Sequence, residues 1–211
     1  MILIIGAGFS GAVIARELAE AGFKIVIIDK RNHIGGNAFD YLDENGIRIH
    51  KYGPHIFHTN SKDVFEWLSR YTEWVPYKHK VKAQLSNGRF VTLPVNKETS
   101  EIVGNENIVS TFIRPYSEKM WGMKLEELDP NILKRVPIRD DVNEYYFPND
   151  EYQFMPKEGY TTIFKNILDH PSITVKLSTP YTKDMEHEFN HIFCSMPIDE
   201  YYNFKFGPLP Y

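Results

Sequence analysis

The chain has 211 residues, a length that suits one domain with an insertion or two small lobes. Its hydrophobic content of 42% and net charge of −4 are ordinary for a globular protein and argue against a nucleic-acid or membrane-surface partner. The single cysteine, Cys194, excludes an intrachain disulfide, and we recognise no signal peptide and no membrane span. We therefore expect a cytoplasmic protein.

The N-terminal residues predict a β-α-β unit. Residues 2–5 form an apolar run typical of a buried strand, residues 12–21 have helical periodicity, and residues 24–29 form a second strand. The face of the helix that we expect to be buried comprises Val13, Ile14, Leu18 and Ala21.

The middle of the chain has different patterns. Residues 46–59 predict a strand and a tight turn, residues 61–71 predict a helix, and residues 80–93 predict a hairpin that turns at Asn87-Gly88. Residues 102–121 include a further predicted helix. The last predicted elements are a helix over residues 161–168 and strands over residues 172–177 and 191–197, with Cys194 expected in the core.

This order of elements predicts an α/β fold. We expect a Rossmann-like domain with a parallel sheet, interrupted by a smaller lobe of helices and antiparallel strands. The predicted boundaries are residues 1–75 for the dinucleotide-binding core and its loops, 76–155 for the inserted lobe, and 156–211 for the return to the first domain.

The turn between the first strand and the first helix carries Gly6, Gly8 and Gly11 in the spacing G-x-G-x-x-G. A helix start offers free backbone N–H groups to a phosphate, and glycines let a pyrophosphate approach them. Asp29 ends the second strand, where a carboxylate can accept hydrogen bonds from a ribose. A purely structural turn and a solvated Asp29 are the alternatives.

The loop after Asp29 helps to choose between NAD and FAD. It places Arg31, Gly35 and Gly36 where charge and bare backbone can meet a ligand, an extension that many FAD proteins carry. A surface loop is the alternative. From "RNHIGGNAF" and "HKYGPHIFHT" onwards, the chain resembles the UDP-galactopyranose mutase family, and the resemblance continues through "RPYSEKMWG", "LKRVPIR", "YYFPNDEYQFMPKEGYTTIF" and "SMPIDEYYNFKFG".

The resemblance implies an isomerase that interconverts UDP-galactopyranose and UDP-galactofuranose, in the biosynthesis of galactofuranose and cell-surface polysaccharide. It implies FAD in its reduced form, whose N5 forms a covalent adduct with the sugar. The implied cofactor-binding residues are Gly6, Gly8, Ser10, Gly11, Asp29, Lys30, Arg31, Gly36, Asn37, His55 and Ile56. The implied catalytic residues are His55, beside the flavin ring, and Arg135, on a loop that binds diphosphate.

The resemblance also implies a UDP-sugar site in the inserted lobe. Its residues would be His79, Tyr116, Ser117, Trp121, Arg135 and Tyr146. Without the resemblance, Tyr116 and Trp121 would be interpreted as core packing, and Arg135 as a solvated basic residue. We expect no metal site at His55 and His58, because Gly53-Pro54 argues against the helix that would pair them.

Two departures from the family pattern shape the expectations. The segment from Lys97 to Arg114 is shorter than the family's helical domain, which puts a homodimer in doubt, and family members continue well beyond Tyr211. We therefore expect a fragment or a natural truncation that is inactive alone. The alternatives are a flavin-dependent oxidoreductase of the amine-oxidase type and a non-catalytic nucleotide-binding remnant.

Overall fold

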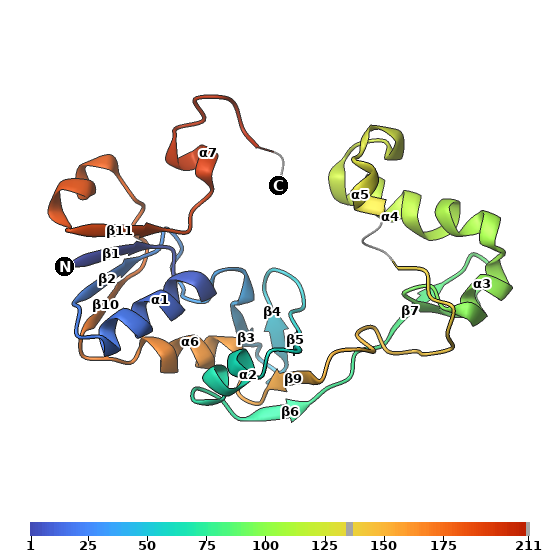
Figure 1. Ribbon diagram of the computed structural model, residues 1–211, viewed down its shortest axis with the longest axis horizontal. Helices are drawn as coiled ribbons and strands as arrows, with labels where there is room; N and C mark the ends of the chain where they lie inside the picture. Colours follow the sequence, from blue (N-terminus) through green and yellow to red (C-terminus); the bar gives the residue numbers. More distant parts are fainter. Residues whose placement is uncertain (134–136, 210–211) are drawn as a thin grey trace. The chain divides into compact units, whose positions relative to one another are not determined.

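The computed structural model describes residues 1–133 and 137–209. It divides into two compact units, which Figure 1 shows in the colours of the sequence. Unit 1 comprises residues 1–76 and 154–211, and unit 2 comprises residues 77–153. The chain leaves unit 1 after one strand and returns along the antiparallel partner of that strand, with Trp74 opposite Pro156.

Unit 1 is built on a four-stranded parallel sheet in the order β10-β2-β1-β11. Its strands are β1 (Ile2–Ile5), β2 (Ile25–Ile28), β10 (Ile173–Lys176) and β11 (His191–Cys194). The two central strands, β1 and β2, are buried along their whole length, as expected for a parallel sheet with both faces covered. This sheet confirms the predicted Rossmann-like α/β fold.

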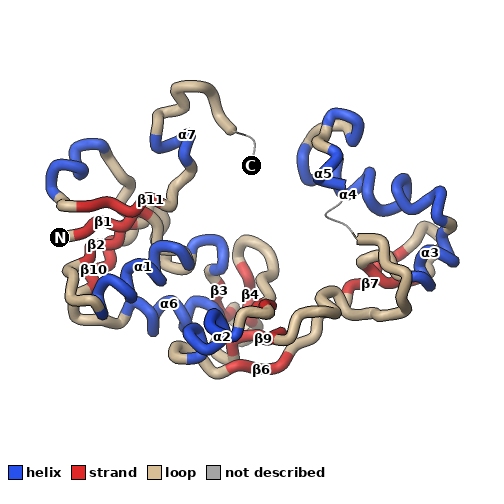
Figure 2. Tube along the Cα trace, viewed as in Figure 1, coloured by secondary structure: helices blue, strands red, loops and turns tan. Residues whose placement is uncertain are grey.

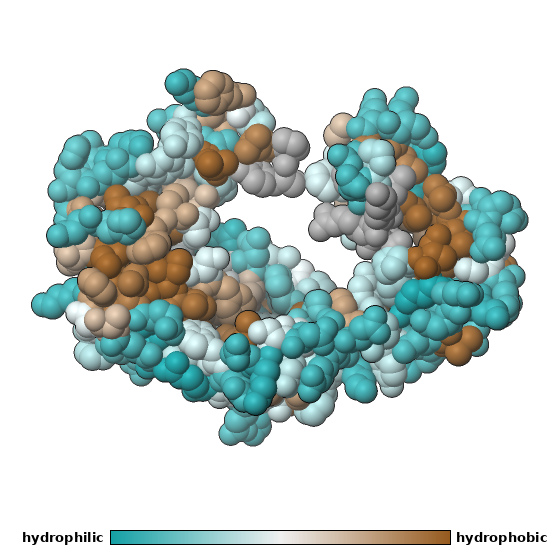
Figure 3. Space-filling view, in the orientation of Figure 1, coloured by the Kyte–Doolittle hydropathy of each residue, from teal (hydrophilic) through white to brown (hydrophobic). Residues whose placement is uncertain are grey.

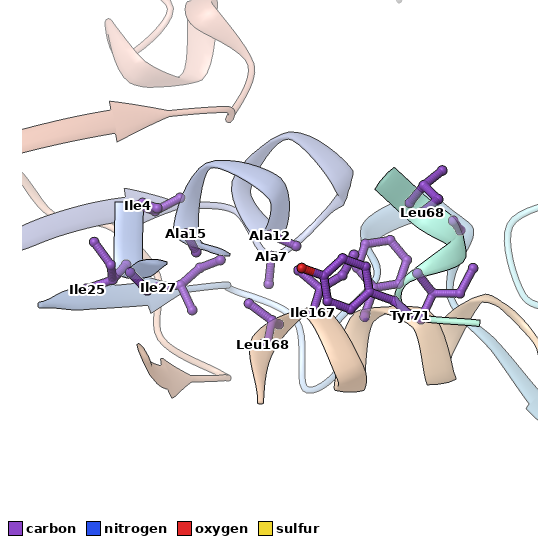
Figure 4. Close-up of a cluster of buried hydrophobic side chains, with 14 of the residues drawn as sticks. Ile4, Ala7, Ala12, Ala15, Ile25, Ile27, Leu68, Tyr71, Ile167 and Leu168 are labelled. Atoms are coloured by element: carbon purple, nitrogen blue, oxygen red, sulfur yellow. The ribbon is translucent and has the colours of Figure 1, made fainter. Parts of the chain in front are cut away.

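Two helices pack side by side against the core of the sheet: α1 (Phe9–Glu20) and α6 (Tyr160–Leu168) (Figures 1 and 4). The residues of α1 that are fully buried are Gly11, Ala12, Ala15 and Ala19. The predicted face was wrong in detail, because Ile14 and Leu18 are only partly buried and Ala21 is exposed. Small side chains let the helix backbone approach the sheet closely, so the alanines face inward and the larger residues flank them.

The other elements of unit 1 surround this core. They are β3 (Asp40–Leu42), β4 (Arg48–His50), β5 (Phe57–Thr59), α2 (Lys62–Ser69), β6 (Trp74–Pro76), β9 (Tyr152–Pro156, which crosses the boundary between the units), α7 (Ile198–Tyr201) and 3₁₀ helices at Gly36–Ala38 and Lys183–Glu188. β3 and β4 form an antiparallel pair, and β5, β9 and β6 form a three-stranded sheet.

Asp40 joins β3 to the start of α6. Its fully buried carboxylate accepts the backbone N–H groups of Tyr160 and Thr161, each at 2.8 Å, and Arg48 lies 3.6 Å away. These donors are among those that the first turn of a helix leaves unpaired. Asp40 therefore caps a helix that lies far away in the sequence.

Unit 2 is mostly helical, with one two-stranded ribbon (Figure 2). Its elements are β7 (Val81–Gln84), β8 (Phe90–Leu93), α3 (Lys97–Val103), α4 (Arg114–Trp121), α5 (Pro130–Leu133), 3₁₀ helices at Asn105–Asn107 and Leu125–Glu127, and a π-helical segment at Val109–Ile113. The predicted hairpin at Asn87-Gly88 is confirmed. The hydrophobic core of this unit is formed by Val95, Ile108, Ile113, Leu125 and Leu128.

Cys194 does not lie in the core. It ends β11, which is an edge strand of the parallel sheet, and its side chain is exposed. The prediction of burial was wrong because an apolar strand pattern does not distinguish a central strand from an edge strand. Among residues 1–133 and 137–209, we find no helix with the length and apolar character needed to cross a membrane.

Candidate functional site

A pocket of about 240 Å³ lies in unit 1 at the carboxyl ends of the parallel strands β1, β2 and β11. This edge of an open α/β sheet is where ligands usually bind. The residues predicted for the cofactor that line the pocket are Gly6, Gly8, Asp29, Lys30, Arg31, Gly36 and Asn37. The sequence therefore identified most of one wall of the pocket.

The opposite wall was missed. It is formed by residues that follow β10 and β11: Thr179, Pro180, Tyr181, Ser195, Met196, Pro197 and Glu200. A signal was present in the sequence, because residues just beyond the carboxyl ends of parallel strands converge on the same edge of the sheet.

The three glycines of the turn have different physical roles. Gly6 has φ of 102°, and a Cβ there would overlap the hydroxyl of Ser195, while a Cβ on Gly11 would overlap the carbonyl oxygen of Gly6. At Gly8, φ is an ordinary −82°, and a Cβ would lie 3.8 Å from the Cα of Gly36. The protein's own packing thus requires Gly6 and Gly11, whereas the missing side chain of Gly8 leaves open space at the pocket.

The first turn of α1 presents backbone donors. Gly8 is the N-cap and offers no side-chain acceptor, and the first turn contains no acidic residue. Ala12 is the first residue whose N–H bonds back to the Gly8 carbonyl, at 2.9 Å, so the N–H groups before it have no partner within the helix. Together with the helix dipole, these donors favour a phosphate.

Asp29 has a structural task besides any contact with a ligand. Its carboxylate accepts the backbone N–H of Ala7 and that of Arg31, each at 2.9 Å, and so ties the end of β2 to the glycine turn. Each carboxylate oxygen has a second lone pair that a ribose hydroxyl could use.

The two basic residues after Asp29 are held by neighbours. The guanidinium of Arg31 donates to Asn37 at 2.9 Å and lies over the ring of Tyr52, 4.5 Å from its centroid. The ammonium of Lys30 pairs with Glu200 at 2.8 Å. Arg31 is therefore held at the pocket wall, while the ammonium of Lys30 is paired with a carboxylate.

His55 and Ile56 line a different pocket of unit 1, of about 680 Å³, whose other walls include Phe9, Trp67 and Tyr160. Its lining is largely apolar and aromatic, and hydrophobic residues also gather on the surface over α1 (Figure 3). Both pockets adjoin the same end of α1, because Phe9 directly follows Gly8.

The loop that carries His55 is held by short-range hydrogen bonds. Nδ1 of His55 lies 2.9 Å from the carbonyl oxygen of Gly53, and the backbone N–H of His55 donates to Nδ1 of His50 at 3.4 Å. Burial lowers the pKa of His50, against the opposing effect of Asp40, and so favours the neutral ring that can accept this bond. Within the described ranges, we find no group of three His, Cys, Asp or Glu residues able to hold a metal ion.

Two of the predicted substrate-binding residues of unit 2 are neighbours. The backbone N–H of Tyr146 donates to the carbonyl of His79 at 2.8 Å, and their rings lie 5.7 Å apart. The hydroxyl of Tyr77 lies 3.1 Å from Nδ1 of His79, and burial lowers the pKa of this histidine. The result is a cluster of aromatic rings around a histidine that is favoured in its neutral form.

The predicted residues of α4 have three environments. Tyr116 is 60% exposed, Ser117 is buried, and Trp121 packs against the core of unit 2. Core packing therefore accounts for Trp121 but not for Tyr116, whose ring is available to a ligand. Arg135 lies outside the described residues.

Comparisons with known proteins cover both units. The family model for UDP-galactopyranose mutase matches residues 111–211, and the model for an NAD(P)-binding Rossmann-like domain matches residues 4–71. A crystal structure of reduced UDP-galactopyranose mutase superposes with a TM-score of 0.54 at 24% identity, covering 83% of this chain and 48% of that one. This likeness supports the fold.

Curated relatives match the chain from end to end. A probable UDP-galactopyranose mutase of Klebsiella pneumoniae and a dTDP-fucopyranose mutase of Escherichia coli are each 37% identical over 100% of the chain, and they are covered to 64% and 66% of their own length. A UDP-galactopyranose mutase of Mycoplasma pneumoniae is 32% identical over 99% of the chain and is covered to 65%. The chain thus spans somewhat less than two thirds of these relatives. From end to end, it is similar to UDP-galactopyranose mutases.

Proposed function

We propose that this chain supplies the FAD-binding turn and the nucleotide-sugar-binding residues of an isomerase that interconverts UDP-galactopyranose and UDP-galactofuranose. The observation that carries the proposal is the pocket at the glycine turn, in a chain similar throughout to UDP-galactopyranose mutases. The open space at Gly8, the free N–H groups of α1 and the fixed carboxylate of Asp29 suit a dinucleotide.

The residues of unit 1 would divide the cofactor between them. The start of α1 would bind the pyrophosphate, Asp29 the ribose, and the loop of His55 and Ile56 the flavin ring. A reduced flavin supplies a nucleophilic nitrogen for the anomeric carbon of the sugar. The imidazole of His55, whose Nδ1 lies 2.9 Å from the carbonyl oxygen of Gly53, would contact that ring.

The residues of unit 2 would bind the nucleotide sugar. The exposed ring of Tyr116 offers a stacking surface to the base, and the hydroxyl of Tyr146, beside His79, offers a hydrogen bond to the diphosphate. Arg135 would add a forked, charged donor to the same phosphates.

The name of one relative supports a second candidate substrate. The Escherichia coli relative named dTDP-fucopyranose mutase is as similar to this chain, at 37% identity, as the Klebsiella pneumoniae relative is. The amine-oxidase alternative has a weaker match, since (S)-6-hydroxynicotine oxidase of Paenarthrobacter nicotinovorans is 24% identical over 95% of the chain. A thymidine nucleotide sugar is therefore the competing substrate to test first.

The purified chain, mixed with FAD and reduced with dithionite, should be incubated with UDP-galactopyranose and, separately, with dTDP-fucopyranose. We expect the chain to bind FAD. Ring contraction of the UDP-sugar, detected by chromatography against an oxidised control, would support the isomerase and show that the chain is active alone, whereas FAD binding without turnover is the result expected of a fragment. A chain that binds no FAD would contradict the proposal. Oxidation of an added amine would favour the oxidoreductase.

A further inference from the structure

The segment between Arg139 and Tyr146 lies outside every helix and strand of unit 2. One isolated bridge, between Tyr145 and Lys80, pairs it with the residues before β7. This segment nevertheless places Tyr146 beside His79. Contacts outside regular secondary structure must therefore hold the segment in place.

Arg139 provides those contacts. Its guanidinium donates from Nη1 to the carbonyl of Tyr145 at 2.8 Å and from Nη2 to the carbonyl of Asn143 at 2.9 Å. Its own backbone N–H donates to the carbonyl of Val95 at 2.8 Å, and Val95 is fully buried in the core of unit 2. Arg139 thus connects Asn143 and Tyr145 to the buried core of the unit.

The other side-chain contacts of the segment are weaker anchors. The buried Asn96 side chain also donates to the carbonyl of Asn143, but at the longer distance of 3.4 Å. Glu144 pairs with Lys80 and Lys82 at 2.8 and 2.5 Å, but these side chains are 41–44% exposed, where ion pairs contribute little. Charge-assisted bonds from a guanidinium to carbonyls are stronger, and a lysine cannot reproduce their fixed fork. The remaining donor of Arg139, Nε, is buried and has no acceptor among the described residues.

We infer that Arg139 is a positioning residue. Its hydrogen bonds to the carbonyls of Asn143 and Tyr145 hold the backbone in the conformation that places the hydroxyl of Tyr146 where it can donate to the diphosphate of a nucleotide sugar. The inference rests on the proposed function, because it assigns a support to one residue of the proposed site. It requires no contact between Arg139 and the ligand.

The test is a calorimetric titration of the chain with UDP, for Arg139→Met, Tyr146→Phe and the double variant. Arg139→Met should weaken UDP binding about threefold to thirtyfold, the range for one or two lost hydrogen bonds. The double variant should bind no more weakly than the weaker single variant, because both changes remove one interaction. Arg89→Met is the matched control, since this exposed side chain in unit 2 has no hydrogen bond or ion pair with a described residue.

Hydrogen exchange of the Tyr146 amide, measured without UDP, provides a second readout and should accelerate in Arg139→Met but not in Arg89→Met. Should Arg139→Met fail to fold, Arg139→Lys decides, with an intermediate loss of UDP affinity expected. Unchanged UDP affinity in the Arg139 variants, or losses that multiply in the double variant, would overturn the inference alone. Absence of UDP binding by the unsubstituted chain would overturn the proposed role of unit 2, and the inference about Arg139 with it.

Discussion

The candidate sites of the two units are built from different chemical groups: mostly backbone in unit 1 and side chains in unit 2. In unit 1, the pocket at α1 depends on backbone: free N–H groups, glycines and a carboxylate that itself binds backbone N–H groups. In unit 2, the proposed site depends on side chains: the rings of His79, Tyr116 and Tyr146. A site made of backbone leaves a trace in the sequence as glycine spacing, whereas one made of side chains does not.

The two sites also differ in what holds them in place. The glycine turn is continuous with the buried strands β1 and β2, so its geometry is fixed by the core of the sheet. The cluster around His79 is held by a segment without regular structure, through hydrogen bonds to carbonyl groups. We expect substitutions at the glycine turn to separate folding from binding by position, and substitutions in the segment that holds the His79 cluster to couple the two.

The largest expected effect concerns the glycine turn of unit 1, where Gly11 and Gly8 should respond differently to substitution. Gly11→Ala should destabilise the chain by about 3 kcal/mol or more, because its Cβ would overlap the carbonyl oxygen of Gly6 in backbone that cannot yield. Gly8→Ala should leave the free energy of unfolding nearly unchanged, since its φ is ordinary and its Cβ meets no atom closer than 3.8 Å. Urea unfolding of the two variants measures both values.

Flavin binding completes that test. Gly8→Val should abolish stoichiometric FAD binding in a chain that still folds, because a branched side chain would fill the space at the pocket. Retention of FAD by a folded Gly8→Val chain would mean that the pyrophosphate does not lie on this turn.

The next effect compares two aromatic residues of α4 in unit 2, which lies outside the segment that holds His79. Trp121→Ala should cost about 2 kcal/mol of stability, because its ring packs against the core cluster of this unit. Tyr116→Ala should leave stability within about 0.5 kcal/mol and weaken UDP binding about tenfold, because its ring is exposed and free to stack. Thermal unfolding and UDP titration of both variants are needed, and equal behaviour of the two would break the distinction between them.

The sequence predicted well where local pattern and tertiary structure agree. The strands at residues 2–5 and 25–28 and the hairpin at Asn87-Gly88 follow from apolar runs and turn residues. The predictions for the buried face of α1 and for the burial of Cys194 were wrong. Close packing of a helix on a sheet favours alanine, and the sequence of one strand does not reveal whether that strand lies at the edge of the sheet.

Asp40 and Arg139 were missed for another reason. Asp40 caps a helix that begins more than a hundred residues later, and Arg139 binds carbonyl groups, which leave no residue signature. The partners of both are backbone groups, so no pairing of side-chain types could have revealed them. Only the resemblance to a family pointed to Tyr116 and Tyr146.

A smaller effect tests whether a side chain of unit 1 outside the glycine turn can be substituted without loss of FAD binding. Tyr71 packs in the apolar cluster beneath α1 (Figure 4), with the guanidinium groups of Arg16 and Arg70 over its ring, and its buried hydroxyl has no hydrogen-bond partner among the described residues. Tyr71→Phe should therefore raise the free energy of unfolding by about 1 kcal/mol and leave FAD binding unchanged. A loss of stability in urea unfolding would show that the hydroxyl has a partner in solution.

The smallest effect concerns acid, which should weaken both units through their histidines. Burial lowers the pKa of His50 in unit 1 and of His79 in unit 2 below the ordinary value of 6.5. The unfolded chain therefore binds more protons than the folded chain, and stability should fall as the pH drops below about 6.5. The charged groups around His50 act in opposite directions, since Asp40 favours its protonation while Arg48 and His55 oppose it.

Urea unfolding between pH 7.5 and 5.5 measures this slope, a window chosen around the unperturbed histidine value of about 6.5. His50→Asn and His79→Asn should each flatten part of the slope, and the exposed His187→Asn is the matched control. His50→Asn should also loosen the loop of His55, because the acceptor of the His55 N–H changes. A stability that rises on acidification, or a slope that His187→Asn flattens as much as His50→Asn does, would contradict the assignment. Because the bond to His50 joins an imidazole to backbone, this variant also shows whether the loop of His55 in unit 1 depends on a side chain.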